Sequence, residues 1–239
     1  MAKMKTVDQT YSGIDNLEVL ACAKNYNGYL INQIQSESKH TDRLIDFGAG
    51  TGYFASTLRD NAKTVVCIET DPSLSDRLHS NNFITHTHLS NISDDSSDFI
   101  YTLNVLEHID DDLSAMSNLF SKLRPGGKLF VYVPAFNVLY SSMDRKVGHH
   151  RRYTHDELCA KLSVIGFNIL RSEYVDSLGF FASLVFKYFG NANGTIDERS
   201  VRIYDRFIFP LSRLLDQVTH PLFGKNLLVV ATKPGQENH

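Results

Sequence analysis

Five residues early in the chain have the types and spacing of a turn that binds a small molecule. They are Asp46, Gly48, Gly50, Gly52 and, about 20 residues after the turn, Glu69. Glycines between a strand and a helix let the backbone and its exposed amides approach a ligand closely. An acid that ends the following strand accepts hydrogen bonds from ribose hydroxyls in folds of this kind. The alternative is a tight structural turn followed by an exposed acid.

Tyr53 distinguishes this turn from the usual dinucleotide-binding pattern. A GxGxxG fingerprint would require glycine at that position. Asp46 would also be a poor neighbour for a pyrophosphate, because both are negatively charged. The same carboxylate would be a good neighbour for a cationic amino-acid group. The residues therefore favour a ribose-containing ligand with a cationic end over a nicotinamide dinucleotide.

A second group of candidates is a basic row in the loop after a predicted strand. It comprises His149, His150, Arg151, Arg152 and Tyr153. Histidine can abstract a proton near neutral pH, and arginine can hold phosphate or carboxylate in bidentate fashion. We interpret the histidines and the tyrosine as catalytic candidates, and the arginines, with Tyr140 of the same loop, as substrate-binding residues. The alternative is a solvated turn in which one arginine pairs with a loop acid such as Asp144.

Strands and helices alternate along the chain, which predicts an α/β fold with a largely parallel sheet. Apolar runs within residues 43–47, 63–69, 97–104, 128–134, 167–175 and 226–232 predict the strands. Residues 110–124 predict a helix stopped by the Pro-Gly-Gly at 125–127, and Thr154 with Glu157 predicts a capping box at the start of another. Active sites of such folds lie beyond the carboxyl ends of the strands, so both candidate groups should meet at one edge of the sheet.

Composition limits the class of protein. The chain has 239 residues, a formal net charge of −3 and a pI near 6.3. A dedicated nucleic-acid binder would usually be basic. Cys22, Cys67 and Cys159 are scattered without a CxxC pair, which predicts reduced thiols in a cytoplasmic protein. We expect neither a secretory signal nor a membrane-spanning segment.

Four stretches resemble class I S-adenosylmethionine-dependent methyltransferases in order and spacing: "DFGAGTG", "VVCIETD", "LNVLEHIDDD" and "LRPGGKLFVYVP". The resemblance is strongest to a small-molecule branch that includes ubiquinone- and menaquinone-biosynthesis methyltransferases. "NYNGYL" and "GHHRRYTHDEL" resemble bacterial methyltransferases that accompany glycosyltransferases of lipid or polysaccharide pathways. The resemblance implies a Rossmann-like fold with a mostly parallel seven-stranded sheet and helices on both faces.

The resemblance also implies S-adenosyl-L-methionine as cofactor and gives residues their roles. Asp46 would hold the methionine ammonium group. The turn would line the methionine and ribose through Gly48, Ala49 and Gly50. Glu69, with Thr70 beside it, would bind the ribose hydroxyls.

Four further positions carry roles implied by the resemblance. Asn104 would present its carbonyl to the ammonium group. Ser90 or Asn91 would lie beside the adenine, at a place where the family often has Asp. Tyr26 would cover the methionine end, or else be an aromatic residue of the core.

The segment "LNVLEHI" lacks the Asn-Pro-Pro-Tyr-like motif of many enzymes that methylate nucleobases, so no DNA partner is expected. We interpret Glu107 and His108 within it as a capping and packing pair in preference to catalytic residues. His86-x-His88 has no evident third ligand, and no pattern in the sequence requires a metal.

Residues 176–225 form an apolar insertion before the last strand. One side of "VRIYDRFIFPLSRLLDQV" is apolar and the other carries arginine and aspartate. The segment could be a lid, a face for a homodimer or an element lying on the inner membrane surface. The alternative is a helical subdomain packed on the edge of the sheet. We thus expect a helical cap at 1–40, a core at 41–175 and 226–233, and this insertion.

The sequence therefore predicts an S-adenosylmethionine-dependent methyltransferase that acts on a small-molecule or lipid-like, anionic acceptor. A protein or RNA methyltransferase is the alternative among enzymes. A non-catalytic scaffold or sensor that binds S-adenosylmethionine is the alternative outside enzymes.

Overall fold

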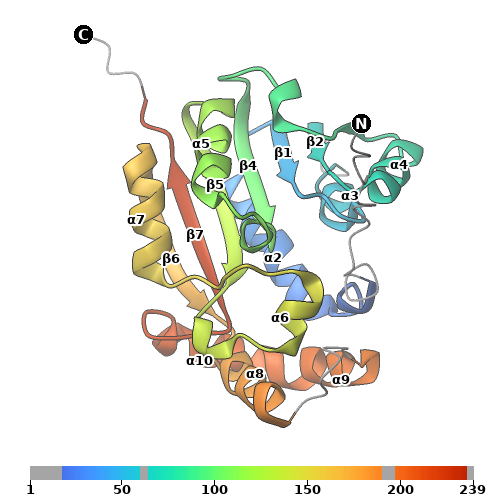
Figure 1. The fold of residues 1–239 in the computed structure, drawn as a ribbon, viewed down its shortest axis with the longest axis vertical. Helices are drawn as coiled ribbons and strands as arrows, with labels where there is room; N and C mark the ends of the chain where they lie inside the picture. Colours follow the sequence, from blue (N-terminus) through green and yellow to red (C-terminus); the bar gives the residue numbers. More distant parts are fainter. Residues whose placement is uncertain (1–17, 60–63, 190–196, 236–239) are drawn as a thin grey trace, which may run out of the picture.

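The computed structural model describes residues 18–59, 64–189 and 197–235. Its centre is a seven-stranded sheet of order β3-β2-β1-β4-β5-β7-β6 (Figure 1). The strands are β1 (Arg43–Phe47), β2 (Thr64–Ile68), β3 (Ile84–His86), β4 (Ser97–Leu103), β5 (Leu123–Pro134), β6 (Asn168–Val175) and β7 (Asn226–Thr232). All neighbouring strands are parallel except β7, which is antiparallel to β5 and β6. The prediction of a mostly parallel seven-stranded sheet is confirmed.

Helices cover both faces of the sheet because side chains alternate along each strand. The described helices are α2 (Lys24–Glu37), α3 (Tyr53–Arg59), α4 (Pro72–Ser80), α5 (Asp112–Lys122), α6 (Ser142–Val147), α7 (His155–Ile165), α8 (Ser177–Phe189), α9 (Glu198–Ile203) and α10 (Phe209–Thr219). In β5, Val131 and Val133 pack with residues of α5 and α7. The intervening Tyr132 packs on the opposite face with residues of α2, α3 and α4.

Two predicted boundaries differ from the structure. The predicted helix before the Pro-Gly-Gly ends earlier, at Lys122, and β5 already begins at Leu123. Arg124 precedes a proline, which disfavours helical backbone angles, and Gly126 has a φ of 81°. At the other end of the chain, α2 begins at Lys24, and residues 1–17 of the predicted helical cap lie outside the described residues.

The insertion between β6 and β7 consists of α8, α9, a π-helical turn (Tyr204–Ile208) and α10 (Figure 1). Two of its acids cap helices that begin elsewhere in the sequence. The Asp205 carboxylate accepts from the N–H groups of Asn25 and Tyr26 at 2.9 and 2.8 Å. It thereby satisfies the first turn of α2, which has no side-chain cap of its own.

The second acid, Asp216, serves α8 in the same way. Its carboxylate accepts from the N–H groups of Asp176 and Ser177 at 2.8 and 2.9 Å. Asp205 and Asp216 are buried, and the positive ends of the two helix dipoles, together with Arg213 at 2.7 Å from Asp216, offset the cost of burying their charges.

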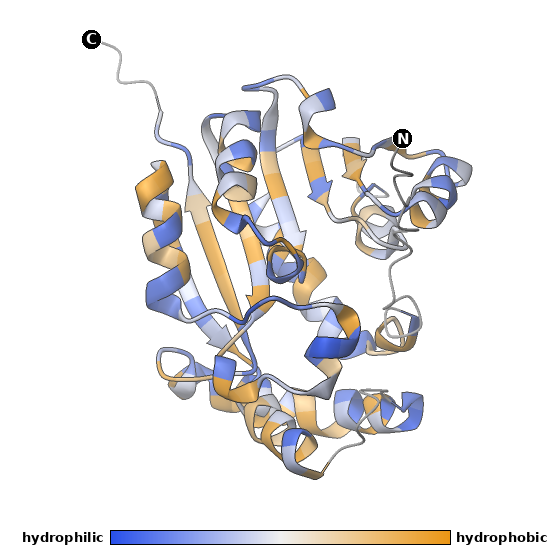
Figure 2. Ribbon diagram, viewed as in Figure 1, coloured by the Kyte–Doolittle hydropathy of each residue, from blue (hydrophilic) through white to orange (hydrophobic). Residues whose placement is uncertain are grey.

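The apolar stripe of the insertion faces outward. Helices were predicted here and are present, and they pack on α2 through Phe209, which is 2% exposed, but the stripe takes no part in this packing. Instead, Phe207, Leu214 and Val218 are 62%, 60% and 78% exposed. Figure 2 shows these helices with a large apolar content at the end of the molecule that lies below the sheet. The acids must face inward to cap α2 and α8, so the opposite, apolar side is left outside.

We expect Asp205→Ala to lower the free energy of unfolding by about 2 kcal/mol, since two N–H groups lose a charged acceptor. Urea denaturation followed by far-UV circular dichroism measures this loss. Asp197→Ala is the matched control, because Asp197 caps only its own helix, accepting from Ser200 N–H at 2.9 Å. An Asp205 variant no less stable than the control would contradict the capping role.

Candidate active site

The glycine turn joins β1 to α3 and has positive φ at all three glycines, 83°, 55° and 79°. A Cβ added to Gly48 would lie 2.2 Å from Cγ2 of Val105, so only glycine fits between the turn and the loop after β4. The N–H groups of Gly48 and Ala49 donate to the Ile68 carbonyl at 2.9 and 3.1 Å. The turn therefore lies at the carboxyl ends of β1, β2 and β4.

Glu69 holds the turn in place from the end of β2. Its Oε2 accepts from the Gly50 N–H at 2.7 Å, and its Oε1 accepts from the Asp71 N–H at 2.9 Å. One carboxylate thus joins the glycine turn to the start of α4. Thr70 follows it on the surface. The exposed Ser90 and Asn91 belong to a short 3-10 turn after β3.

Asp46 lies below the turn and is buried. Its Oδ2 accepts a hydrogen bond of 2.7 Å from the Tyr101 hydroxyl. Burial raises the pKa of Asp46 to about 7 and nearby Glu69 adds to the rise, while the tyrosine hydroxyl opposes it. A cationic group beside this carboxylate would favour its ionised form.

Asn104 and Tyr26 meet beyond the carboxyl end of β4. Asn104 has a φ of 54°, and its N–H donates to the Tyr132 carbonyl at 2.8 Å. Its side chain interacts with the hydroxyl of Tyr26, whose pKa burial raises well above its ordinary value. The Tyr26 ring packs edge-on against Phe209 of the insertion, with centroids 5.3 Å apart. The structure therefore places Tyr26 beside Asn104, and its role at the methionine end of the donor stays a prediction.

The loop after β5 is organised around Asp144, which is fully buried. Its Oδ1 lies 2.8 Å from both His149 Nδ1 and Arg152 Nε, and its Oδ2 lies 3.0 Å from Arg152 Nη2. Its Oδ2 also accepts from the Ser141 N–H at 2.8 Å. Burial alone would raise the pKa of Asp144, but the hydrogen bonds with His149 and Arg152 hold it well below its ordinary value.

Arg152 and Tyr153 of the basic row are bound to side chains inside the protein and do not face a substrate. Arg152 is 3% exposed and pairs with Asp144, which is the alternative considered for one arginine. Tyr153 is fully buried, and its hydroxyl donates to Asp112 Oδ2 at 2.7 Å. We therefore correct the assignments of Arg152 to the substrate and of Tyr153 to catalysis, because their polar atoms are bound inside the protein.

The other residues of the loop lie nearer the surface. Arg151 is held by the Asp110 carbonyl at 2.7 Å from Nη2, and its Nη1 is 3.0 Å from Asp112 Oδ1. His150 has a side chain that is 46% exposed. Tyr140 donates its hydroxyl to the His149 carbonyl at 2.7 Å, so it supports the loop.

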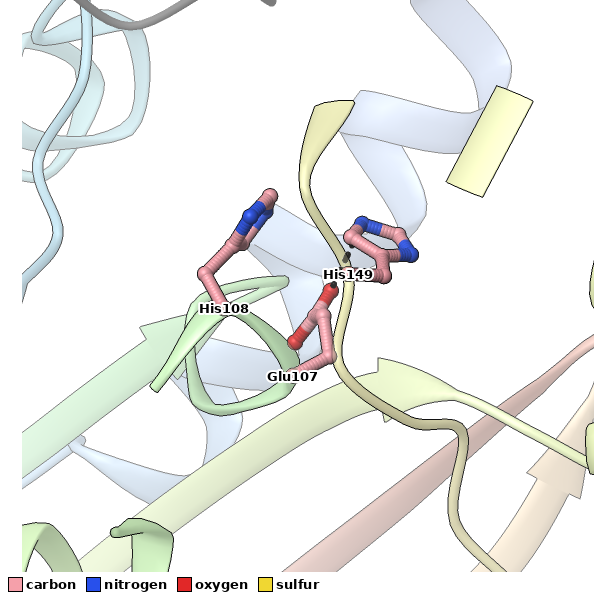
Figure 3. Close-up of side chains that lie close together, drawn as sticks. All are labelled: Glu107, His108 and His149. Atoms are coloured by element: carbon pink, nitrogen blue, oxygen red, sulfur yellow. Dashed lines mark ion pairs between the residues drawn. The ribbon is translucent and has the colours of Figure 1, made fainter. Parts of the chain in front are cut away.

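A cluster of Glu107, His108 and His149 is a feature that the sequence analysis missed (Figure 3). One potential ligand atom from each residue lies within 4.8 Å of the others. Glu107 is not the expected helix cap; Asp111 caps α5 by accepting from Ser114 N–H at 3.0 Å. Burial raises the pKa of Glu107 to about 8. The only signal in the sequence was an acid and histidines in two loops that follow neighbouring strands.

Comparison with known proteins gives the class. Residues 21–172, more than half of the chain, match the model of a methyltransferase domain. The chain belongs to this methyltransferase-domain family, and the predicted family and cofactor are confirmed at that level. A curated relative of Mycolicibacterium smegmatis, named "Probable S-adenosylmethionine-dependent methyltransferase", is 28% identical over 145 residues, 58% of this chain and 54% of the relative. The chain thus spans about half the length of the curated relative that it matches.

Solved structures share the fold. A methyltransferase from Archaeoglobus fulgidus, described as S-adenosylmethionine-dependent, has a TM-score of 0.59 at 15% identity, covering 87% of this chain and 94% of that one. The 4+2 cyclase SpnF has a TM-score of 0.59 at 18% identity, covering 87% and 81%. At such identities the likeness shows the fold alone. Because one neighbour is a cyclase, the reaction has to be argued from the site.

We expect Arg152→Ala to lower the free energy of unfolding by about 3–5 kcal/mol, because it leaves the buried Asp144 without its cation. Chemical denaturation measures the change. Arg145→Ala in the same loop is the control, since Arg145 is exposed and should change stability by no more than about 0.5 kcal/mol. Equal effects of the two substitutions would show that the Asp144 pair does not hold the loop.

Proposed function

We propose that the protein transfers the sulfonium methyl group of S-adenosylmethionine to a small-molecule or lipid-like acceptor. The observation that carries the proposal is the meeting of Asp46, the glycine turn and Glu69 at one edge of the sheet. In the transfer the bond between sulfur and methyl breaks, its electron pair stays on sulfur, and a lone pair of the acceptor forms the new bond. Holding the two reactants in line is then the main catalytic requirement.

On the donor side, each residue has a chemical reason for its role. Asp46 offers a buried negative charge to the methionine ammonium group, and Asn104 offers a carbonyl. Glu69, only 8% exposed, has two carboxylate oxygens at the edge of the turn, where the ribose diol would lie. Tyr26 covers the methionine end from α2. Ser90, Asn91 and Thr70 remain candidates for the adenine and ribose edges.

We expect Glu69→Gln to weaken S-adenosylmethionine binding by more than about tenfold, because an amide replaces the charged acceptor of the ribose hydroxyls. Isothermal titration calorimetry with S-adenosylmethionine measures the affinity. Glu157→Gln is the control, since that side chain is 40% exposed on α7. Folded wild-type protein that does not bind S-adenosylmethionine would disprove the proposed function. Transfer of labelled methyl to a lipid extract by wild type, and not by Glu69→Gln, would separate an enzyme from a sensor.

On the acceptor side, the loops after β4 and β5 carry the candidate residues. His149, held by Asp144, and His150, half exposed, are the candidates that contact the acceptor or its proton. Arg151 contributes less charge than its position in the sequence suggests, because Asp110 and Asp112 surround its guanidinium. A protein or RNA acceptor would require a basic or peptide-binding surface. The paired arginines and the net charge of −3 favour a small or lipid-like one.

The outward apolar face of the insertion supports contact with a membrane surface. In this proposal residues 41–175 and 226–233 form the core that binds the donor, and the loop 137–153, residues 1–40 and residues 176–225 form the acceptor site. Twelve large apolar residues in the described part of the insertion are exposed: Phe181, Val185, Tyr188, Phe189, Ile203, Phe207, Ile208, Leu211, Leu214, Leu215, Val218 and Leu222. Within the described ranges, no helix has the length and apolar character to cross a bilayer. The helices would therefore lie on its surface.

The charges of the π-helical turn and of α10 fit an anionic surface. Their acids, Asp205 and Asp216, point inward, whereas Arg206 is exposed, with its guanidinium 5.4 Å from the centroid of the Phe207 ring. Lys187 lies beside the exposed Tyr188 in a similar way, at 5.9 Å. Cations beside apolar side chains can meet lipid phosphates while the apolar groups enter the interface.

We expect the protein to float with vesicles that contain anionic lipid, and the double substitution Phe189→Asp and Val218→Asp to weaken this by at least about tenfold, because two apolar contacts are lost. Vesicle flotation in a density gradient measures the bound fraction. The control is Val164→Asp on α7, which is also highly exposed, at 81%, but belongs to another helix. Wild-type protein that stays in solution as a dimer, and dissociates on the double substitution, would assign this face to a second copy of the chain.

A further inference from the structure

Glu107 is the starting point, because its carboxylate is buried without a hydrogen-bond partner among the described residues. The side chain is fully buried, and neither Oε1 nor Oε2 has such a partner. The nearest basic atom is His149 Nε2, 3.7 Å from Oε1. This separation is too long for a hydrogen bond. A buried carboxylate is costly unless a proton or a cation accompanies it.

The orientation of His149 favours a cation. Its Nδ1 lies 2.8 Å from Oδ1 of Asp144, a carboxylate held ionised by Arg152. When Nδ1 donates to Asp144, the neutral imidazole presents a lone pair at Nε2. In that tautomer Nε2 and Oε1 of the Glu107 carboxylate face each other as two potential ligand atoms. Two ligands about 2.1 Å from one Zn²⁺ ion at a tetrahedral angle would be about 3.4 Å apart, close to the separation seen.

His108 completes the group from the same loop as Glu107. Its ring lies edge-on to that of His149, with centroids 4.6 Å apart. Hydrogen bonds with the backbone of Val147 and Gly148 orient it. Outer contacts of this kind, a carboxylate for one imidazole and backbone carbonyls for the other, accompany most histidine ligands of metals. Figure 3 shows the three side chains converging from the loop after β4 and the loop before α7.

We propose that Glu107, His108 and His149 bind one divalent transition-metal ion. Two imidazoles and a carboxylate favour Zn²⁺, Fe²⁺ or Co²⁺ over Mg²⁺ or Ca²⁺. No motif in the sequence indicated a metal, because the ligands come from two loops that only the fold brings together.

If the proposed function holds, on which this step rests, the ion would bind an oxygen of the acceptor. Three protein ligands leave coordination positions open, as in catalytic metal sites. A hydroxyl bound there would release its proton to solvent more readily. Its oxygen lone pair would then form the bond to the methyl group, and the electron pair of the broken C–S bond would stay on sulfur.

Titration of metal-free protein with Co²⁺, followed by its visible absorption, tests the site. We expect one ion per chain in the wild type, and an affinity reduced in Glu107→Gln and in His149→Asn by more than the ~10–100-fold typical of losing an outer contact. His150→Asn is the matched control, because His150 is the next residue along the chain and lies outside the cluster. Circular dichroism and S-adenosylmethionine calorimetry on each variant confirm that the fold is intact.

The outcomes separate this proposal from the proposed function. Wild-type protein that binds S-adenosylmethionine but no Co²⁺ would overturn the metal site and leave methyl transfer standing. Equal Co²⁺ binding by wild type, Glu107→Gln and His149→Asn would overturn it too. Stoichiometric Co²⁺ that depends on Glu107 and His149, in a protein that does not bind S-adenosylmethionine, would support the metal site and disprove the proposed function. If one variant fails to fold, the other carries the comparison with His150→Asn.

Discussion

The loop on the acceptor side depends on one buried carboxylate, Asp144. Removing a carboxylate from water costs several kcal/mol unless a cation lies close to it, so Arg152 leaves the solvent together with it. The carboxylate oxygens of Asp144 also form hydrogen bonds with the Ser141 N–H and with the His149 ring. These bonds fix both ends of α6 and the residues that follow it. The direction of His149 Nε2, and with it the whole cluster around Glu107, follows from this ion pair. A row that is strongly basic in the sequence thus presents little unpaired charge in the fold.

The donor side is built by a simpler rule. Neighbouring parallel strands end at the same edge of a sheet. An acid at the end of β2 therefore lies beside a turn at the end of β1. Glu69 uses this proximity by binding Gly50 and Asp71, which holds the turn in the shape that a ligand would need. Asp46 lies one layer deeper, where burial keeps its pKa near 7. In the proposed function the two acids have different ligands, since Glu69 would accept from the ribose hydroxyls and Asp46 would lie beside the cationic ammonium group.

The parts of the molecule that could be predicted from the sequence are those set by local pattern. Six of the seven strands and the position of the glycine turn follow from apolar runs and from the glycines between them, whereas no such run predicted the three-residue β3 (Ile84–His86). Arg152 and Tyr153 could not be assigned from their types, because their partners Asp144 and Asp112 lie in other elements and only burial decides between a partner and a substrate. The pattern of the insertion revealed an amphipathic helix but not which side would face out. The orientation follows from Asp205 and Asp216, which must face inward to accept from the N–H groups at the starts of α2 and α8.

The capping residue Asp205 also links the apolar outer face of the insertion to the proposed donor site. Asp205, on the inner side of the insertion, holds the N–H group of Tyr26 at 2.8 Å, and the Tyr26 ring packs on Phe209 at the start of α10. The same tyrosine reaches Asn104 at the end of β4, where the methionine end of the donor would lie. Any displacement of the insertion must therefore stretch a charged hydrogen bond to α2 or move Tyr26 with it. The insertion with its apolar outer face and the proposed donor site thus share the first turn of α2, so a displacement of the insertion would also move the tyrosine that we propose to cover the donor.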